Sequence, residues 1–316
     1  MVNELAIRTQ DLTKQFDRHI AVHDIDLHIG IGEVYGLIGP NGAGKTTLIR
    51  MLAAAEEPTL GEIYIHGDRL LRDQDNPNLK RQIGYLPDDF PLYDDLTVWD
   101  YLDYFARLYK LGEPRRSQRL RDVLELVQLT HKRHSQISTL SRGMKQRLSL
   151  ARTIIHEPLV LLLDEPVSGL DPIARMQFRE IIKALQAAKM TILISSHVLS
   201  DLAELCTSVG IMELGYLVES TSLQHLYQRL SRQQITLSTL GSLEALQAEL
   251  RNHPEVEGME ALPGNNRLKV FFSGDGEASA TLLRSLIAAN IPLTEFHPAQ
   301  EDLESIFLNL GHQQAS

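Results

Sequence analysis

A chain of 316 residues is longer than one typical domain, so length alone predicts about two domains. Hydrophobic residues make up 43% of the chain and charged residues 23%, an ordinary globular composition that excludes a mostly disordered protein. The formal net charge of -10 argues against nucleic-acid binding, which normally needs a basic surface.

The single cysteine, Cys206, excludes an internal disulfide and favours a reducing compartment. No apolar run approaches the ~20 residues that a membrane-spanning helix needs. The N-terminus has neither the basic nor the apolar region of a signal peptide. We therefore expect a cytoplasmic protein.

The first part of the chain alternates between strand and helix patterns. Strands are expected within 5–38, at 61–65, at 83–86, at 160–163 and at 191–195. Helices are expected at 44–54, at 173–188 and in the helical stretch 97–155, which Thr97 can cap. The strand at 160–163 is wholly apolar, as in a buried parallel sheet. This alternation predicts an α/β core.

A second series of elements follows a polar helical segment at 221–233. The expected order is strand 235–240, helix 243–250, strand 256–261, strand 268–272, helix 278–289 and strand 293–296. This β-α-β-β-α-β order is the ferredoxin-like arrangement, and a terminal helix is expected at 301–310. We therefore predict a main domain at 1–233 and a small α+β domain at 234–316.

A glycine-rich segment directly after the strand ending at Ile38 fits the phosphate-binding pattern G-x-x-x-x-G-K-[ST]. Backbone N–H groups and a helix N-terminus would surround the phosphates, and glycines let the backbone approach closely. Lys45 would contact the β- and γ-phosphates, and the Thr46 hydroxyl would bind Mg²⁺. The expected nucleotide-binding residues are Gly39, Pro40, Asn41, Gly42, Ala43, Gly44, Lys45, Thr46 and Thr47.

Two carboxylates, Asp164 and Glu165, end the apolar strand at 160–163. In a P-loop protein an acid at this place holds Mg²⁺, a role that falls to Asp164. Glu165 can then orient or deprotonate the attacking water. The two motifs predict a P-loop nucleotidase, without distinguishing an ATPase from a kinase or GTPase.

Four further motifs narrow the class, because together they resemble ABC-type ATPases. Residues 140–147 are similar to the signature motif, 168–171 to the D-loop, 195–197 to the H-switch and 84–88 to the Q-loop. Phe16 stands where that family stacks an aromatic ring on adenine. The order and spacing match over residues 3–233, and the tail containing 301–307 is similar to that of ATP-binding subunits in the ABC-2 type exporter group.

The resemblance implies a P-loop ABC-type ATPase domain with a helical subdomain at about 89–155 and a head-to-tail homodimer with ATP between the copies. Ser141 and Gly143 of one copy would contact the γ-phosphate bound by the other. His197 would contact the γ-phosphate, so Glu165, His197 and Lys45 are the expected catalytic residues. Mg²⁺ would be held by Thr46, Asp164 and Asp88.

Three residues depart from the family's usual motifs. Arg142 and Met144 replace the third and fifth residues of Leu-Ser-Gly-Gly-Gln, and Asp88 replaces the usual Q-loop glutamine. Met144 cannot make a glutamine's polar contact near the ribose. An ionised Asp88 can bind Mg²⁺ or water but cannot donate a hydrogen bond.

The resulting hypothesis is a nucleotide-binding subunit that hydrolyses ATP to ADP and phosphate to drive a membrane exporter. It would lie on the inner face of the cell membrane, with a separate membrane-spanning permease and a second copy of itself as partners. The alternative is an ABC ATPase acting on the ribosome or DNA. The single cassette and the separation of 96 positions from Lys45 to Ser141, too short for a long coiled coil, disfavour it.

Positive charge is concentrated between Phe105 and Arg152, where twelve Lys or Arg face three Asp or Glu. Such a segment is either a solvated helix surface or a partner-binding surface. Our hypothesis is that part of it faces anionic headgroups or acidic loops of the permease. The candidates, which lie outside every nucleotide motif, are Arg115, Arg116, Arg119 and Arg121.

Overall fold

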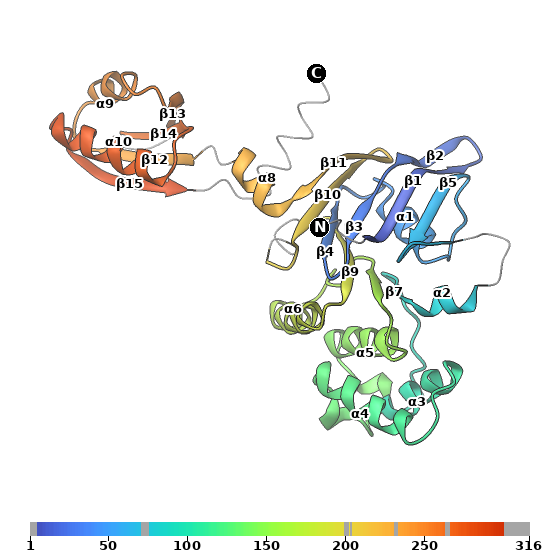
Figure 1. Cartoon of the computed structure of the whole chain (residues 1–316). Coiled ribbons are helices and arrows are strands. Elements are labelled where there is room, and N and C mark those ends of the chain that lie inside the picture. The colour runs from blue at the N-terminus through green and yellow to red at the C-terminus, as the bar shows by residue number, and fades with distance from the viewer. Residues whose placement is uncertain are drawn as a thin grey trace. The chain divides into compact units, whose positions relative to one another are not determined.

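The computed structural model describes residues 5–70, 76–198, 202, 204–230, 233–262 and 266–299. The chain divides into two compact units, Met1–Leu223 and Gln224–Ser316 (Figure 1). The expected domain ranges 1–233 and 234–316 stay a prediction. The expected terminal helix at 301–310 and the tail motif at 301–307 lie outside the described residues.

An antiparallel sheet forms one layer of the first unit. Its strands run in the order β2-β1-β5-β6, and β3 pairs with β1. The strands are β1 (Leu5–Phe16), β2 (His19–Ile25), β3 (His28–Gly30), β5 (Leu60–Ile65) and β6 (Asp68–Arg69). Phe16 pairs with His19 across the β1–β2 hairpin, which places both residues at the end of this sheet.

A six-stranded sheet, parallel except at one edge, forms the second layer. Its order is β11-β10-β4-β9-β8-β7, with β11 antiparallel to β10. The strands are β4 (Val34–Ile38), β7 (Ile83–Leu86), β8 (Val160–Leu163), β9 (Thr191–Ser196), β10 (Ser208–Glu213) and β11 (Tyr216–Ser222). Every residue of β4, β8 and β9 is buried. The apolar sequence of β8 is typical of a sheet covered on both faces, whereas β9 also buries the polar residues Thr191, Ser195 and Ser196.

Helix α1 (Lys45–Leu52) shares one buried core with both sheets. Its side chains Leu48 and Leu52 belong to the same cluster as Ile29 of the antiparallel sheet and Leu162 of the parallel sheet. The helix that follows the glycine-rich loop is therefore fixed from both sides by apolar packing.

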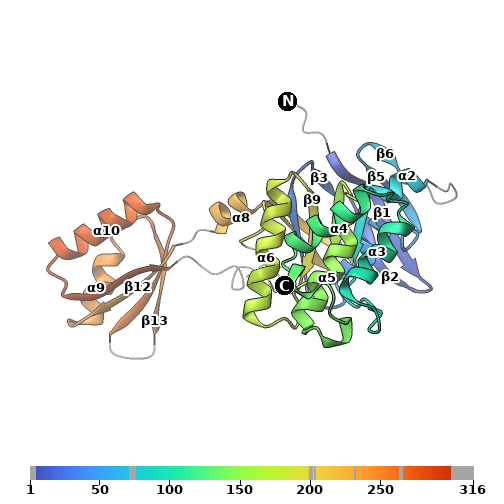
Figure 2. The ribbon, with the colours of Figure 1, turned by 90° about the horizontal axis from the view of Figure 1, so that it is seen from below.

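Most of the remaining helices of the first unit begin at a side-chain cap, although the helix that starts at Arg115 has none. Thr97 accepts a hydrogen bond from the Asp100 N–H at the start of α3, which confirms the predicted cap. Asp171 caps α6, whose first residue is the favourable Pro172. These helices are α2 (Pro77–Arg81), α3 (Val98–Leu108), α4 (Arg115–Leu126), α5 (Arg142–Ile154) and α6 (Pro172–Ala187), with short 3₁₀ turns at Thr130–Lys132 and Ile137–Thr139. Figures 1 and 2 show α3, α4 and α5 gathered together.

The second unit is a four-stranded antiparallel sheet covered by two helices. The strand order β13-β14-β12-β15 and the β-α-β-β-α-β chain order confirm the ferredoxin-like prediction. Apolar residues of both α9 and α10 join one core with the sheet. The elements are α8 (Leu223–Leu230), β12 (Gln233–Thr239), α9 (Leu243–Leu250), β13 (Val256–Leu262), β14 (Arg267–Phe272), α10 (Gly276–Ala288) and β15 (Leu293–Ala299).

Candidate nucleotide-binding and hydrolysis site

The glycine-rich loop joins the end of β4 to the start of α1, as predicted. Gly42 and Gly44 have φ of 85° and 101°, a region that glycine adopts without strain. A Cβ on Gly39 would lie 2.3 Å from the Met212 carbonyl oxygen, and one on Gly44 would lie 2.3 Å from that of Ala21. The loop therefore requires glycine for both conformation and close packing.

Lys45 is 5% exposed and its ammonium turns back over the loop. Nζ donates hydrogen bonds to the carbonyl oxygens of Gly39 at 2.6 Å and Pro40 at 3.2 Å. It also lies 3.3 Å from Oε1 of Glu165. The lysine thus joins the loop to the acid at the end of β8.

Asp164 is 1% exposed and faces the start of α1. Its Oδ1 accepts hydrogen bonds from the hydroxyls of Thr46 at 3.2 Å and Ser195 at 2.8 Å, while Oδ2 is buried without a partner. Burial raises the pKa of Asp164, and the charges of Glu165 and Asp88 add to the rise, against the lowering effect of the two hydroxyls. A buried carboxyl oxygen without a partner beside the Thr46 hydroxyl is a donor set that suits a hard cation.

The carboxylate of Glu165 lies between the ammonium of Lys45 and the imidazole of His197. Oε1 faces Lys45, and Oε2 lies 2.8 Å from Nδ1 of His197. The backbone of Glu165 has a φ of 48°, a left-handed conformation that is uncommon outside glycine, and its N–H donates to Ser195 Oγ at 2.9 Å. The backbone conformation and two side-chain contacts therefore fix the orientation of the Glu165 carboxylate.

A cavity of about 390 Å³ is lined by Lys45 and Glu165, whereas Asp164 and His197 are not among its lining residues. The sequence prediction included most of its lining, but not His19 and Ala21. The pairing of His19 with Phe16 is the signal that could have found them, because both belong to one hairpin. The lining residues are Phe16, His19, Ala21, Asn41, Gly42, Ala43, Gly44, Lys45, Thr46, Thr47, Asp88 and Glu165.

Asp88 lies in this cavity at the carboxyl end of β7. Burial raises the pKa of Asp88, and the neighbouring charges of Glu165 and Asp89 raise it further. Asp88 therefore adds to a concentration of acids beside the loop, where a glutamine would be neutral.

Ser141 and Gly143 do not line this cavity. Ser141 caps α5 by accepting a hydrogen bond from the Met144 N–H, and a Cβ on Gly143 would lie 2.5 Å from Ala174 Cβ. Arg142 donates to the Ser168 carbonyl oxygen at 3.1 Å and packs against Gly169. The substituted residue of the predicted signature motif thus contacts the predicted D-loop of the same chain.

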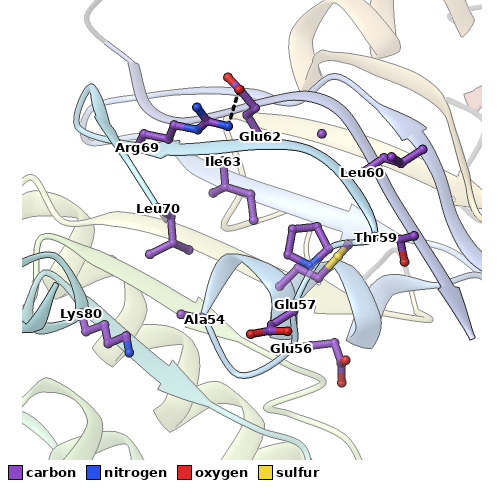
Figure 3. A pocket seen from close by; sticks show the side chains of 13 residues that line it. Ala54, Glu56, Glu57, Thr59, Leu60, Glu62, Ile63, Arg69, Leu70 and Lys80 are labelled. Carbon is purple, nitrogen blue, oxygen red and sulfur yellow. Dashed lines mark ion pairs between the residues drawn. The ribbon is translucent and has the colours of Figure 1, made fainter. Parts of the chain in front are cut away.

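Two other cavities lie outside the phosphate-binding loop. One, of about 540 Å³, lies beyond the end of α1 and contains the Arg69–Glu62 ion pair (Figure 3). The other, of about 470 Å³, lies between the segment 88–92 and α5, and Asp88 borders both it and the cavity of the glycine-rich loop.

The described residues contain no group of three or more His, Cys, Asp or Glu side chains arranged to hold a metal ion. Within the same ranges, no helix combines the length and apolarity needed to cross a bilayer.

A glycine-rich loop at the carboxyl end of β4, beside an aspartate and a glutamate that follow β8 in the same parallel sheet, defines a P-loop nucleotidase. Residues 22–168 match the family model described as ABC transporter. The chain is 35% identical to the uncharacterized ABC transporter ATP-binding protein YxlF of Bacillus subtilis, over 96% of this chain and 98% of the relative. It is 32% identical to the bacitracin transport ATP-binding protein BcrA of Enterococcus faecalis, over 98% and 97%.

The fold is also similar to a solved ATP-binding subunit of an ABC transporter. That likeness has a TM-score of 0.64 and 31% identity, and it covers 78% of this chain and 99% of the other. This chain belongs to the ATP-binding proteins of ABC transporters. It binds nucleotide and couples ATP hydrolysis to transport, which confirms the predicted class.

Proposed function

We propose that this chain drives an exporter as its nucleotide-binding subunit, lying on the cytoplasmic face of the membrane beside a separate permease. The relative of similar length that acts in bacitracin transport supports a transporter that moves compounds foreign to the cell. The chain itself meets the permease and not the cargo, so its site does not define the cargo's chemistry.

The observation that carries the hydrolytic assignment is the chain of contacts from Lys45 through Glu165 to His197. Lys45 would bind the β- and γ-phosphates. The Glu165 carboxylate, positioned by its two neighbours, would accept a hydrogen bond from the attacking water and take up its proton. His197 would hold that carboxylate and contact the γ-phosphate.

Mg²⁺ fits the residues around Asp164, because this ion commonly takes one or two carboxylates together with phosphate and water. Asp164 and the Thr46 hydroxyl would hold it, with Asp88 nearby at the cavity wall. When bound, the ion supplies positive charge to the phosphates as the γ-phosphoryl leaves.

A second copy of the chain would complete the site. Ser141 and Gly143 lie at the N-terminus of α5, where backbone N–H groups attract an anion, yet they are not part of their own chain's cavity. This supports the head-to-tail dimer, in which they contact the γ-phosphate bound by the partner.

The groove between segment 88–92 and α5 is our candidate contact for the permease. It shares Asp88 with the nucleotide cavity, so a partner seated there would lie next to the site of hydrolysis. This shared wall supports direct mechanical coupling between the two.

Replacing Glu165 with glutamine tests the hydrolytic assignment. The variant keeps the shape of the side chain but loses its basicity, so ATP hydrolysis should fall by about 100-fold or more while ATP binding survives. Turnover of ATP, equilibrium binding and the molecular mass in the presence of Mg²⁺ and ATP should all be measured. We expect the variant to accumulate as an ATP-bound dimer.

Glu62→Gln is the matched control, because Glu62 pairs with Arg69 outside the nucleotide cavity. It should hydrolyse ATP at the parent rate. A Glu165→Gln protein that retains parent turnover would exclude Glu165 as the base, and one that stays monomeric with ATP bound would count against the dimer.

A further inference from the structure

The ammonium of Lys14 lies over the ring of Phe16, 4.7 Å from the ring centroid. The Lys14 side chain is 13% exposed, whereas Phe16 is 44% exposed and lines the nucleotide cavity. A cation is attracted to the face of an aromatic ring, more strongly where water is partly excluded. One face of the ring is thus covered by charge, and the ring remains accessible from the cavity.

Two contacts from one turn of the chain hold Lys14 in place. Nζ lies 2.7 Å from Glu56 Oε1 and donates to the Glu57 carbonyl oxygen at 2.7 Å. The hydrogen bond from Lys14 is the largest cause that lowers the pKa of Glu56. Glu56 also borders the cavity beyond the end of α1, where Figure 3 shows it.

This turn belongs to the helix that carries the phosphate-binding lysine. Helix α1 begins at Lys45, and the N–H groups of Ala55 and Glu56 both donate to the Arg50 carbonyl oxygen at its end. The glycine-rich loop and the support of Phe16 are therefore attached to opposite ends of one short helix.

We infer that Lys14 is a positioning residue for nucleotide binding, which fixes the Phe16 ring so that its uncovered face meets the base. The inference rests on the stacking of Phe16 on adenine that the family resemblance implies. A cation held behind the ring also draws electron density from it, which favours contact with an electron-rich purine. A purely structural Lys14 would only join β1 to the turn at Glu56, and base recognition would not depend on it.

The test compares the affinities of the full chain for Mg²⁺–ATP and Mg²⁺–tripolyphosphate, which shares the phosphates but has no base. Lys14→Met keeps the aliphatic stem and removes the charge. It should weaken ATP binding by about three- to tenfold through the lost cation–ring contact and leave tripolyphosphate binding within about twofold. Lys14→Arg should restore ATP affinity, because arginine supplies a cation of similar reach.

Three companion variants make the outcome specific. In a Phe16→Leu background, Lys14→Met should cause no further loss of ATP affinity, as a double-mutant cycle requires of coupled residues. Glu56→Gln, which loosens Lys14 without removing it, should weaken ATP binding in the same direction. Arg69→Met removes a different cation from the sheet that contains β1 and should leave both affinities unchanged.

Equal weakening of ATP and tripolyphosphate, or an undiminished loss in the Phe16→Leu background, would overturn the inference. If Phe16→Leu weakens ATP binding but Lys14→Met does not, only the role of Lys14 fails. If Phe16→Leu leaves the ratio of the ATP and tripolyphosphate affinities unchanged, Phe16 does not stack on the base, and the inferred role of Lys14 fails as well.

Discussion

The imidazole of His156 stacks on Tyr109 at a centroid distance of 4.0 Å, and its Nε2 donates to the Ile83 carbonyl oxygen at 3.2 Å. Burial lowers the pKa of His156 to about 4, and the nearby guanidinium groups of Arg81, Arg119 and Arg152 add to the fall, against the raising effect of the Ile83 carbonyl. The folded protein therefore keeps this histidine neutral at pH values where an unfolded chain would protonate it.

This difference predicts a pH-dependent stability. Because the folded pKa lies below the unfolded value of about 6.5, the folded state loses stability as pH falls from about 6.5 to 4, by at most about 3 kcal/mol from this residue. His156→Phe keeps the ring stack but cannot be protonated. Acidification should therefore lower the free energy of unfolding of the parent more than that of the variant. Urea denaturation of both proteins at each pH measures this difference.

His28→Gln is the control, because His28 is exposed on β3. Its stability difference from the parent should stay nearly constant over the same pH range. A constant gap for His156→Phe as well would show that His156 does not sense pH.

Many of the site residues could be predicted because each motif is short and covalently continuous. The loop at 39–47 and the pair Asp164–Glu165 can each be recognised from the local sequence, because each directly follows a predicted strand. The ring nitrogen of His197 beside Glu165 and the two hydrogen bonds of Ser195 were not predictable in this way. They depend on β8 and β9 being neighbours in the sheet, which the order of strands along the chain does not fix.

At the scale of elements, α4 combines an exposed cationic surface with arginines that hold other helices. Arg119 donates from Nη2 to the Ile154 carbonyl oxygen at 2.6 Å and from Nε to that of Ile155 at 3.1 Å, at the end of α5. Arg116 pairs with Asp103 of α3 at 2.8 Å. Arg115 pairs with Glu157, and among the described residues the hydrogen-bond partner of Arg121 is Gln118 of its own helix.

These partners reduce the number of arginines that are available to contact the membrane or the permease. Arg116 and Arg119 have structural roles between helices, so they are poor candidates for a partner surface. Contact of the segment with a membrane stays a prediction, and Arg121 and Arg115 are now its main candidates.

Arg119→Met should destabilise the first unit by about 1–3 kcal/mol, because two carbonyl groups at the end of α5 lose their charged donor. Arg121→Met, two residues away on the same helix, should change the free energy of unfolding by no more than about 0.5 kcal/mol. Denaturant unfolding of both variants measures the difference. Equal stabilities would show that water replaces the guanidinium of Arg119 without cost.

The element pattern of the first unit was largely predictable, apart from the hairpin of β10 and β11. The central residues of β10 are buried, but β11 reads Tyr-Leu-Val-Glu-Ser-Thr-Ser and is only partly buried or exposed. Neither an alternation of apolar and polar residues nor a shared apolar composition therefore predicts that the two segments form a hairpin. Tertiary contact decides these strands, since β10 pairs with β4 from the start of the chain.

At the scale of the whole molecule, each unit has its own apolar core. The second core includes Leu237, Leu246, Phe272 and Leu282 and contains no residue of the first unit. A domain with a separate core can unfold independently.

Phe272→Ala should therefore lower the stability of the second unit by about 3–5 kcal/mol, because Phe272 is fully buried and its loss leaves a cavity. ATP affinity and the thermal transition of the first unit should be unchanged. Phe271→Ala, on the opposite face of β14, should cost less because Phe271 is only partly buried. Calorimetry resolves the transitions, and a single transition that moves in the Phe272 variant would contradict independent cores.

Strands β4, β7, β8 and β9 are parallel, so their carboxyl ends all lie at one edge of the sheet. Gly39, Asp88, Asp164 and His197 all follow the carboxyl ends of these strands. The opposite edge carries exposed residues that take no part in the cavity, among them Ile31 and Leu159. A fluorophore or spectroscopic tag attached at that inert edge would travel with the nucleotide-binding unit while leaving its chemistry untouched, which makes these two positions natural attachment points for following transport by optical methods.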